Sequence, residues 1–285
     1  MLVCVDVLEA VLSPGVINFF PKILESFFAV PPAKTALLTV PSAALGSIGG
    51  GALARAFRLE LSGMLALAMG ADCLAAFFGF AFLLFCPPPT FTPWEQSCGA
   101  DCGCSKLEWR PVCSSNGHSF PSPCQAGCRQ LHNQSFGDCA CAAGELSSGM
   151  CSREDSCGKM GAFLGLFGLY VLLSMSTSIP IQESELRSLP PDLRSFAFGI
   201  RWLFIRLLGT IPSPMIVGGV VDAACLYKQE GQGQCAVLDN EGLAIFIVLA
   251  GGALKLLVIL CLLIAWRQSR LLEFVLNRKI LEQNL

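Results

Sequence analysis

Six stretches of about twenty largely apolar residues run through the sequence and restrict this chain to very few folds. They lie at approximately residues 2–20, 35–54, 61–85, 159–179, 195–221 and 242–266. A lipid bilayer offers no hydrogen-bond partner to backbone N–H and C=O groups, so a segment that crosses it must be helical or belong to a closed barrel. Stretches of this length therefore predict membrane-spanning helices and an all-α membrane protein.

The composition supports the same class. Charged residues make up 14% of the chain and the mean hydropathy is +0.61, whereas a soluble domain has about 25% charged residues. The formal net charge is −2, and the sequence contains no basic run interleaved with aromatic residues. We therefore expect the lipid bilayer as a partner and no nucleic acid.

The first apolar stretch is the weakest of the six. Asp6 and Glu9 interrupt it, and close to the chain start we expect these two side chains to be in contact with water. Pro14–Gly15 is expected to break the helix. The amino end of a six-helix chain of this kind should be cytoplasmic, which leaves almost no residues before the first helix, so we expect the chain to lack its front.

The fifth stretch carries Arg201 and Arg206 and is expected to break or kink at Ile211-Pro212-Ser213-Pro214. Broken helices in transporters often mark the binding level or a moving gate. A plain helix end at the outer interface is the alternative. We interpret Arg201, near the cytoplasmic end, as an anchor at the membrane surface.

A polar insert between the third and fourth stretches holds ten of the sixteen cysteines. With roughly sixty residues the insert is too small to form a large hydrophobic core. Small domains in an oxidising compartment are usually stabilised by disulfide bonds instead. Zinc is the alternative, but structural zinc sites favour paired cysteine motifs with matching histidines in reducing compartments. We therefore predict disulfide bonds of undetermined pairing and no metal site. The cysteines are Cys98, Cys102, Cys104, Cys113, Cys124, Cys128, Cys139, Cys141, Cys151 and Cys157.

The basic residues of the short loops predict the orientation of the chain. With the insert outside the cell, the inner segments hold eight basic residues, namely Arg55, Arg58, Arg187, Arg194, Arg267, Arg270, Arg278 and Lys279. The outer short loops hold Lys22, Lys34 and Lys228. The positive-inside rule thus agrees with the redox argument. We expect a multi-pass protein of the cell membrane with a cytoplasmic carboxyl terminus, glycosylated at the Asn133-Gln-Ser sequon.

The sequence has no signature of an enzyme. Its two histidines, His118 and His132, both lie in the insert, and no phosphate-binding glycine loop is present. We therefore predict a protein that is not an enzyme and that needs no cofactor.

Part of the insert resembles a Kazal-type module. Residues 104–113 read Cys-Ser-Lys-Leu-Glu-Trp-Arg-Pro-Val-Cys, and Asn116–Gly117 and an aromatic residue precede the next cysteine pair. Asn and Gly both tolerate positive φ in such a turn. The resemblance implies a small extracellular domain, with Lys106 or Leu107 in the loop that inhibitory members present to serine proteases.

Such a module between membrane helices resembles the carboxyl-terminal half of the organic anion transporting polypeptide (solute carrier organic anion) family. Further motifs match over nearly the whole chain: Phe20-Pro-Lys-Ile-Leu-Glu25, the glycine-rich segment 46–51, Ile205-Arg-Leu-Leu-Gly-Thr-Ile-Pro-Ser-Pro214, and Gly218, Asp222 and Cys225. The resemblance implies a six-helix half of a major facilitator-type transporter. Family helices 7–9 would fall in 1–86, a Kazal-like extracellular loop in 87–158, helices 10–12 in 159–266 and a cytoplasmic tail in 267–285.

The family's function is sodium-independent transport of amphipathic organic anions such as bile salts, steroid conjugates, prostaglandins and thyroid hormones, and three basic residues are candidate substrate contacts. Arg206 matches an arginine that the family associates with anionic substrates, and a guanidinium binds carboxylate or sulfate through two hydrogen bonds. A structural ion pair is the alternative. Lys22 matches a lysine at the outer end of the seventh helix, where it either attracts anions or anchors the helix. Lys255 is a charge within a span that either contacts substrate or pairs with Asp72 or a group outside this chain.

Alternating access requires two bundles that rock about a central cavity, so the resemblance implies a missing amino-terminal half or a second copy as partner. Two other functions remain open. The chain is alternatively a membrane-tethered Kazal-like binding module or protease inhibitor, or a nonfunctional truncated isoform. Eight residues separate Cys104 from Cys113, one more than inhibitory loops usually have, which disfavours the inhibitor.

Overall fold

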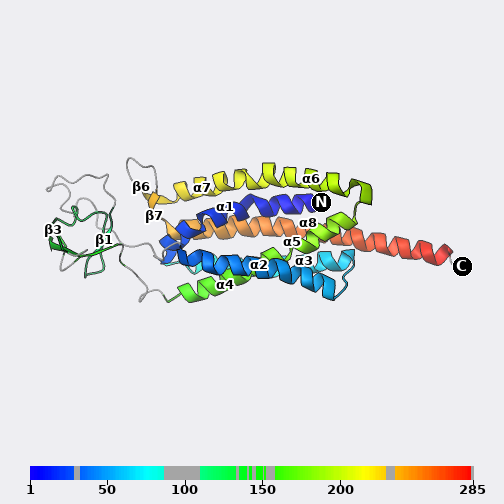
Figure 1. Cartoon of the computed structure of the whole chain (residues 1–285), viewed down its shortest axis with the longest axis horizontal. Helices are drawn as coiled ribbons and strands as arrows, with labels where there is room; N and C mark the ends of the chain where they lie inside the picture. Colours follow the sequence, from blue (N-terminus) through cyan, green and yellow to red (C-terminus); the bar gives the residue numbers. More distant parts are fainter. Residues whose placement is uncertain are drawn as a thin grey trace.

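The computed structural model describes residues 1–28, 33–86, 110–132, 135–139, 141–142, 146–149, 151, 158–228 and 235–283. These residues form a bundle of long helices with a small group of strands beyond one end (Figure 1). The helical elements are α1 (Leu2–Phe28), α2 (Ala33–Ala56), α3 (Leu61–Phe78), η1 (Gly79–Leu83), α4 (Met160–Ser176), α5 (Ser178–Arg187), η3 (Pro191–Leu193), α6 (Arg194–Phe204), η4 (Ile205–Thr210), α7 (Pro212–Ala223) and α8 (Asn240–Gln283).

Within the described residues, five helical runs are long and apolar enough to cross a membrane. They are Leu2–Phe28, Leu61–Leu83, Met160–Arg187, Pro191–Ala223 and Asn240–Val275. The remaining predicted stretch forms α2, a helix of 24 residues that contains Pro41 and four glycines. The prediction of an all-α architecture for the apolar part of the chain is therefore confirmed.

α1 does not break at Pro14–Gly15, and that prediction is wrong. A neighbouring helix supplies a hydrogen-bond partner at this point, because the Gly15 N–H donates to the Ser213 hydroxyl oxygen at 2.7 Å in a buried position. The two helices are very close here: a Cβ atom on Gly15 would lie 2.6 Å from the Ser213 carbonyl oxygen. Proline and glycine are tolerated inside such helices when a neighbour's side chain satisfies the freed backbone group.

The expected break at residues 211–214 is also absent, because α6 continues through the π-helical turn η4 into α7. Pro212 and Pro214 have no N–H to donate. The Ile211 N–H donates to the Arg206 carbonyl, five residues back, at 2.9 Å. At the point where a break was expected, the helix thus contains one wider, π-helical turn. Single π-helical turns inside α-helices are frequent at functional sites.

α2 and α4 pack closely through small residues. A Cβ atom on Gly46 or Gly50 would overlap the backbone carbonyl of Leu172 or Ser176 of α4, whereas one on Gly49 would meet open space. In a membrane, where water provides no hydrophobic push between helices, this close approach is a main source of helix association.

Two apolar clusters fill the bundle. One is rich in phenylalanine and joins α1, η1, α4, α7 and the start of α8. The other joins α1, α3, α5 and the middle of α8, around Leu65 and Leu262. Charged residues lie between the parts of the chain that contribute to the two clusters: Glu9 on α1, Lys255 on α8, and Asp72 between the first half of α3 and η1.

The insert forms a five-stranded antiparallel sheet in the order β2-β1-β5-β4-β3. The turn expected at Asn116–Gly117 joins β1 to β2: Gly117 has φ of 79° and its N–H donates to the Ser114 carbonyl at 2.9 Å. Of the two residues, Gly117 alone adopts positive φ. The Kazal-type assignment stays a prediction. The strands are β1 (Val112–Cys113), β2 (Ser119–Phe120), β3 (Cys128–His132), β4 (Ser135–Cys139) and β5 (Leu146–Ser148), and β6 (Cys225–Lys228) pairs with β7 (Cys235–Leu238) in a separate hairpin.

The strands and the predicted inner segments lie at opposite ends of the bundle (Figure 1). β1–β5 and the β6–β7 hairpin are at one end, whereas the end of α2, the connection from α5 to α6 and the carboxyl-terminal part of α8 are at the other. Arg55, Arg58, Arg187 and Arg194 therefore lie away from the cysteine-rich insert. α8 continues past Trp266 to Gln283 without a break. Which end faces the cell interior stays a prediction.

Candidate functional site

The centre of the bundle holds a buried ion cluster formed by Glu9, Asp72 and Lys255. The Lys255 ammonium donates to Glu9 Oε1 and to Asp72 Oδ1, each at 2.7 Å. The exposed fractions of the three side chains are 23% for Glu9, 0% for Asp72 and 8% for Lys255. Of the two alternatives for Lys255, pairing with Asp72 is thus present in the structure. The contact of Glu9 with Lys255 overturns the expectation that Glu9 is simply in water.

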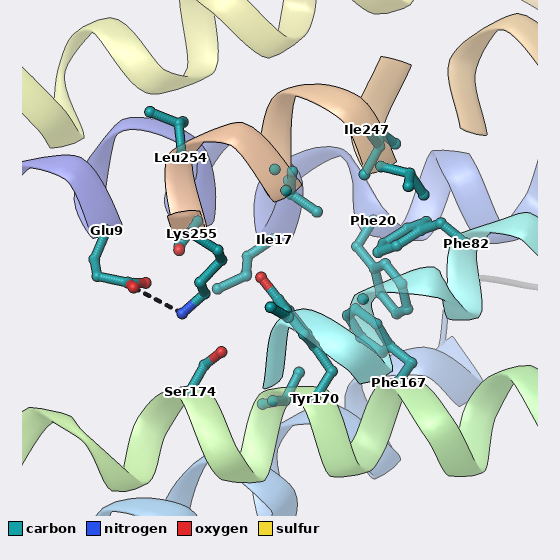
Figure 2. Close-up of a pocket in the computed structure, with 18 of the residues that line it drawn as sticks. Glu9, Ile17, Phe20, Phe82, Phe167, Tyr170, Ser174, Ile247, Leu254 and Lys255 are labelled. Carbon is teal, nitrogen blue, oxygen red and sulfur yellow. Dashed lines mark hydrogen bonds and ion pairs between the residues drawn. The ribbon is translucent and has the colours of Figure 1, made fainter. Parts of the chain in front are cut away.

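A cavity of about 430 Å³ lies directly beside this cluster. Side chains of α1, α2, α3, η1, α4 and α8 line it, and most of them are apolar. Figure 2 shows Glu9 and Lys255 at one end of this cavity, with the hydroxyl groups of Tyr170 and Ser174 directed toward them. The volume falls in the range typical of small-molecule pockets, about 300–1,000 Å³.

The other end of the cavity is aromatic. The rings of Phe20 and Phe167 stack with centroids 4.2 Å apart, and the ring of Phe82 meets that of Phe167 edge-on at 5.5 Å. Phe163 continues the layer, stacked on Phe167 at 5.8 Å. Figure 2 shows Phe20, Phe82 and Phe167 together, opposite the charged end. The cavity therefore has an apolar aromatic end and a charged end, which is the arrangement that suits an amphipathic molecule.

A second buried ion cluster surrounds Arg201. Its Nε lies 2.7 Å from Asp6 Oδ2 and 2.5 Å from Glu185 Oε2. The side chain is 7% exposed, and its guanidinium lies over the Phe198 and Trp202 rings. The interpretation of Arg201 as a surface anchor is therefore wrong, and Asp6 is not simply in contact with water.

The structure places Arg206 away from the cavity. It lies in the π-helical turn η4 on an exposed face, with its guanidinium 5.9 Å from the centroid of the Trp202 ring. Its neighbours Leu207 and Leu208 are each 55% exposed. In this chain Arg206 and Lys255 are therefore not brought together around one site.

Lys22 also lies outside the cavity lining, next to Pro21, which contributes to it. Its ammonium is 3.5 Å from Glu25 Oε2, one helical turn later on α1, and both side chains are more than a third exposed. An exposed pair of this kind contributes little to stability.

Five of the described cysteines of the insert are crosslinked. A disulfide joins Cys113 to Cys151, and Cys124, Cys128 and Cys141 are disulfide-bonded as well. A further disulfide joins Cys225 to Cys235 across the β6–β7 hairpin. Cys139 ends β4. The other predicted residues of the insert lie outside the described residues: Cys98, Cys102, Cys104, Cys157, Asn133, Lys106 and Leu107.

Sequence reasoning missed Glu9, Tyr170 and the aromatic end of the cavity. Glu9 carried a signal, since an acidic residue inside an apolar stretch needs a partner or water, and a lysine inside another stretch was a candidate for that partner. The phenylalanines carried no comparable signal, because apolar residues in a spanning helix face lipid and protein interior alike.

Comparison with known proteins identifies the family. A sequence model of the Organic Anion Transporter Polypeptide (OATP) family matches residues 1–243. Solute carrier organic anion transporter family member 4A1 of Mus musculus is 30% identical over 283 residues, covering 87% of this chain and 39% of that protein. For member 4C1 of Homo sapiens the identity is 30%, covering 84% of this chain and 38% of the relative. Member 1C1 of Homo sapiens is 29% identical, and the match covers 80% of this chain and 37% of that protein.

The chain thus spans about two fifths of the length of these relatives. The family match extends over most of its 285 residues, from the start of α1 into α8. It includes Glu9 and Asp72 of the central ion cluster and ends in the first turn of α8, before Lys255. The chain belongs to the Organic Anion Transporter Polypeptide family.

Proposed function

We propose that this chain supplies one helical half of a membrane transporter for amphipathic organic anions. Membership of the family supports organic anion transport in general. The single observation that carries the proposal further is the cavity of about 430 Å³, with an aromatic end at Phe20 and Phe167 and a buried ammonium, that of Lys255, at the other.

The shape and polarity of this cavity fit a bulky anion with an apolar body. The flat rings of Phe20, Phe82 and Phe167 provide surface for a ring system or a hydrocarbon chain. A carboxylate or sulfate at the other end of the molecule then lies near Lys255, whose ammonium is a donor in a water-poor environment. Bile salts, steroid conjugates, prostaglandins and thyroid hormones share this division into an apolar body and an anionic group.

Arg206 and Lys22 have a different role in this proposal, because neither lines the cavity. Both are exposed in this chain, and Arg206 lies in the π-helical turn with its planar guanidinium stacked beside Trp202. We propose that they contact or attract the anion on its path, Lys22 near the strand end of the bundle and Arg206 on the face of α6–η4–α7. A guanidinium is suited to bind carboxylate or sulfate in passing.

Transport by alternating access needs a second bundle. The proposed partner is an amino-terminal set of helices or a second copy of this chain, against which this half rocks. The many exposed large apolar side chains of α6 and η4, among them Leu203 and Leu207, face either that partner or lipid. We further propose a plasma-membrane location with the disulfide-linked insert outside the cell, as the end-to-end separation of the insert and the basic residues suggests.

The test is uptake of a labelled sulfated steroid into cells that express this chain, alone and joined to the amino-terminal part of mouse family member 4A1. We expect uptake by the joined protein. We also expect Arg206→Ala to reduce it strongly at unchanged surface expression. Uptake that is unchanged by Arg206→Ala means that this residue does not contact the anion on its path. A joined protein that reaches the surface and shows no uptake contradicts the proposal.

The cavity itself is tested by filling it. Gly252 lines the cavity and has open space where a Cβ would lie, so Gly252→Leu occupies the cavity without a backbone clash. Gly165 on α4 has the same open space but does not line the cavity, which makes Gly165→Leu the matched control. We expect the KM for the steroid to rise about tenfold in the first variant, equivalent to ~1.4 kcal/mol, and to stay unchanged in the second. Equal KM values in both variants contradict binding in this cavity.

A further inference from the structure

The central ion cluster carries an unbalanced charge. Two carboxylates, Glu9 and Asp72, each lie 2.7 Å from the single ammonium of Lys255, so one formal negative charge is left over when all three groups are ionised. In the described part of the chain, no second cation faces either carboxylate. A buried carboxylate without a compensating cation is strongly unfavourable, and such a group binds a proton instead.

The two carboxylates differ in their access to water. Asp72 is fully buried; its Oδ1 accepts from Lys255, and its Oδ2 has no hydrogen-bond partner. Glu9 is 23% exposed and lines the cavity. Figure 2 shows its carboxylate and the Lys255 ammonium facing each other at the cavity end. A proton from water therefore reaches Glu9 through the cavity, while Asp72 stays as the permanent counterion of Lys255.

The other groups around the cluster do not remove the imbalance. α4 contributes the Tyr170 phenol, which is neutral at ordinary pH, and the Ser174 hydroxyl. α2 contributes apolar side chains to the cavity, Val40 and Ala43. Asp6, which precedes Glu9 on α1, adds a further negative charge and is held by Arg201 in the second cluster.

A metal cation is a poorer solution than a proton. Within the described residues, no group of three or more His, Cys, Asp and Glu side chains is placed to hold a metal ion. A hard cation needs several oxygen ligands, whereas a proton needs a single carboxylate.

We propose that Glu9 is a proton-binding site that controls the access of the anionic substrate to Lys255. When Glu9 is ionised, it and Asp72 both hold the ammonium. When water in the cavity gives a proton to Glu9, an O–H bond forms at its carboxyl group and its charge is lost. Lys255 then keeps Asp72 as its charged partner, and the side of the ammonium that faces the cavity is free to bind a carboxylate or sulfate. This inference rests on the function proposed above and adds its regulation.

Proton binding and anion binding are then thermodynamically linked. Each substrate anion that replaces Glu9 at Lys255 leaves Glu9 without a cation, so Glu9 takes up a proton from water. Because linkage is reciprocal, a lower pH increases the affinity for the anion. Glu9→Gln removes the charge permanently and is expected to give high affinity at every pH.

The experiment uses the chain joined to the amino-terminal part of mouse family member 4A1. The probe is a sulfated steroid, because its sulfate stays ionised and any pH effect then belongs to the protein. We expect the wild-type KM to fall about tenfold from about pH 8 to about pH 5. We expect the KM of Glu9→Gln to be low and to have the same value at both pH values. Glu183→Gln, an exposed acid on α5 that pairs with Arg187, should keep the wild-type pH dependence.

A second measurement tests the proton site without any transport. The purified proteins, checked for folding by thermal unfolding, are titrated with acid in weak buffer, and we expect the wild type to bind one proton more than Glu9→Gln between about pH 8 and pH 5. Superimposable titration curves overturn the proposal, and so does a wild-type KM that does not change with pH. An extra proton in the titration without steroid uptake supports the proton site and contradicts the proposed transport function.

Discussion

Asp6 and Glu9 lie three residues apart on α1, yet their carboxylates bind different cations. Asp6 accepts from Arg201 of α6 at 2.7 Å, and Glu9 accepts from Lys255 of α8 at the same distance. Residues three apart on a helix are neighbours on its surface, so α1 offers both acids to the interior of the bundle. Each cluster is completed by a second carboxylate, Glu185 of α5 or Asp72 of α3. Ion pairs therefore join α1 directly to α6 and α8, and the same two cations join these helices to α5 and α3.

Removal of the cation from the second cluster is predicted to be severely destabilising. Arg201→Met leaves the carboxylates of Asp6 and Glu185 buried without a positive partner. Breaking a buried ion pair by removal of one partner costs about 3–5 kcal/mol. We expect the thermal unfolding temperature of the protein in detergent to fall sharply, or the protein to be absent from the membrane fraction.

Two variants control this experiment. Arg187→Met removes an exposed arginine whose partner Glu183 is also exposed, and it should change the free energy of unfolding by less than about 1 kcal/mol. Asp6→Asn leaves one carboxylate with one guanidinium and should be much milder than Arg201→Met. If Arg201→Met lowers the unfolding temperature less than Asp6→Asn does, the arrangement of two carboxylates around one guanidinium is contradicted.

The contact between α2 and α4 gives a prediction that is independent of charge. At Gly50 an added methyl group overlaps the Ser176 backbone carbonyl, whereas at Gly49, one residue earlier, it meets open space. Overpacking of this kind costs about 1–3 kcal/mol. Gly50→Ala should therefore lower the unfolding temperature, and Gly49→Ala should leave it unchanged or raise it slightly, because alanine favours the helix. Equal effects of the two variants contradict the observed orientation of α2, in which Gly50 faces α4 and Gly49 does not.

The sequence was sufficient to place the helices but not to decide whether they break. Hydropathy located the apolar stretches because the requirement for lipid-compatible side chains is local. Where α1 continues through Pro14 and Gly15, the Gly15 N–H donates to the Ser213 hydroxyl oxygen, which lies 198 residues later in the chain. No local pattern contains that information. The chain therefore does not break at either proline site, although the proline rule predicts a break in α1 and a break or kink at residues 211–214.

For the charged residues inside the apolar stretches, too, the sequence was sufficient for some conclusions and not for others. The presence of Lys255 inside an apolar stretch indicated that it needs a partner, and Asp72 was named as one possible partner, whereas Arg201 was interpreted as an anchor at the membrane surface. No local pattern assigns Asp6 to Arg201, because the two residues are 195 positions apart. Arg206 was selected by resemblance to the family, and it lies exposed in a π-helical turn that the sequence did not predict.

The insert is predicted to depend on its crosslinks. Cys113–Cys151 closes a segment with a sequence separation of 38 around a core of few apolar side chains, among them Val112, Phe120 and Leu146. Loss of a native disulfide in a small domain typically costs 2–5 kcal/mol, about as much as such a domain has. The paired variant Cys113→Ser/Cys151→Ser should therefore make the insert sensitive to limited proteolysis.

The proteolysis experiment has its control in a disulfide that lies outside the insert. Cys225→Ser/Cys235→Ser opens the short β6–β7 hairpin and should leave the insert resistant to protease. Cleavage within the insert at equal rates in both paired variants and the wild type would show that the Cys113–Cys151 bond is not needed for its fold.

The hydrogen bond from Gly15 to Ser213 gives the last prediction. Ser213 is fully buried, and Ser213→Ala removes the hydroxyl oxygen that accepts from the Gly15 N–H in the tight contact between α1 and α7. The loss of a buried hydrogen bond of this kind costs about 0.5–1.5 kcal/mol. Ser47→Ala is the matched control, because the Ser47 hydroxyl donates to the Ala43 carbonyl of its own helix and its loss leaves no donor without a partner. We expect Ser213→Ala to lower the unfolding temperature and to accelerate amide hydrogen exchange in the middle of α1, with little change in Ser47→Ala. Unchanged exchange in α1 would mean that the Ser213 hydroxyl is not what allows this helix to pass through Pro14 and Gly15.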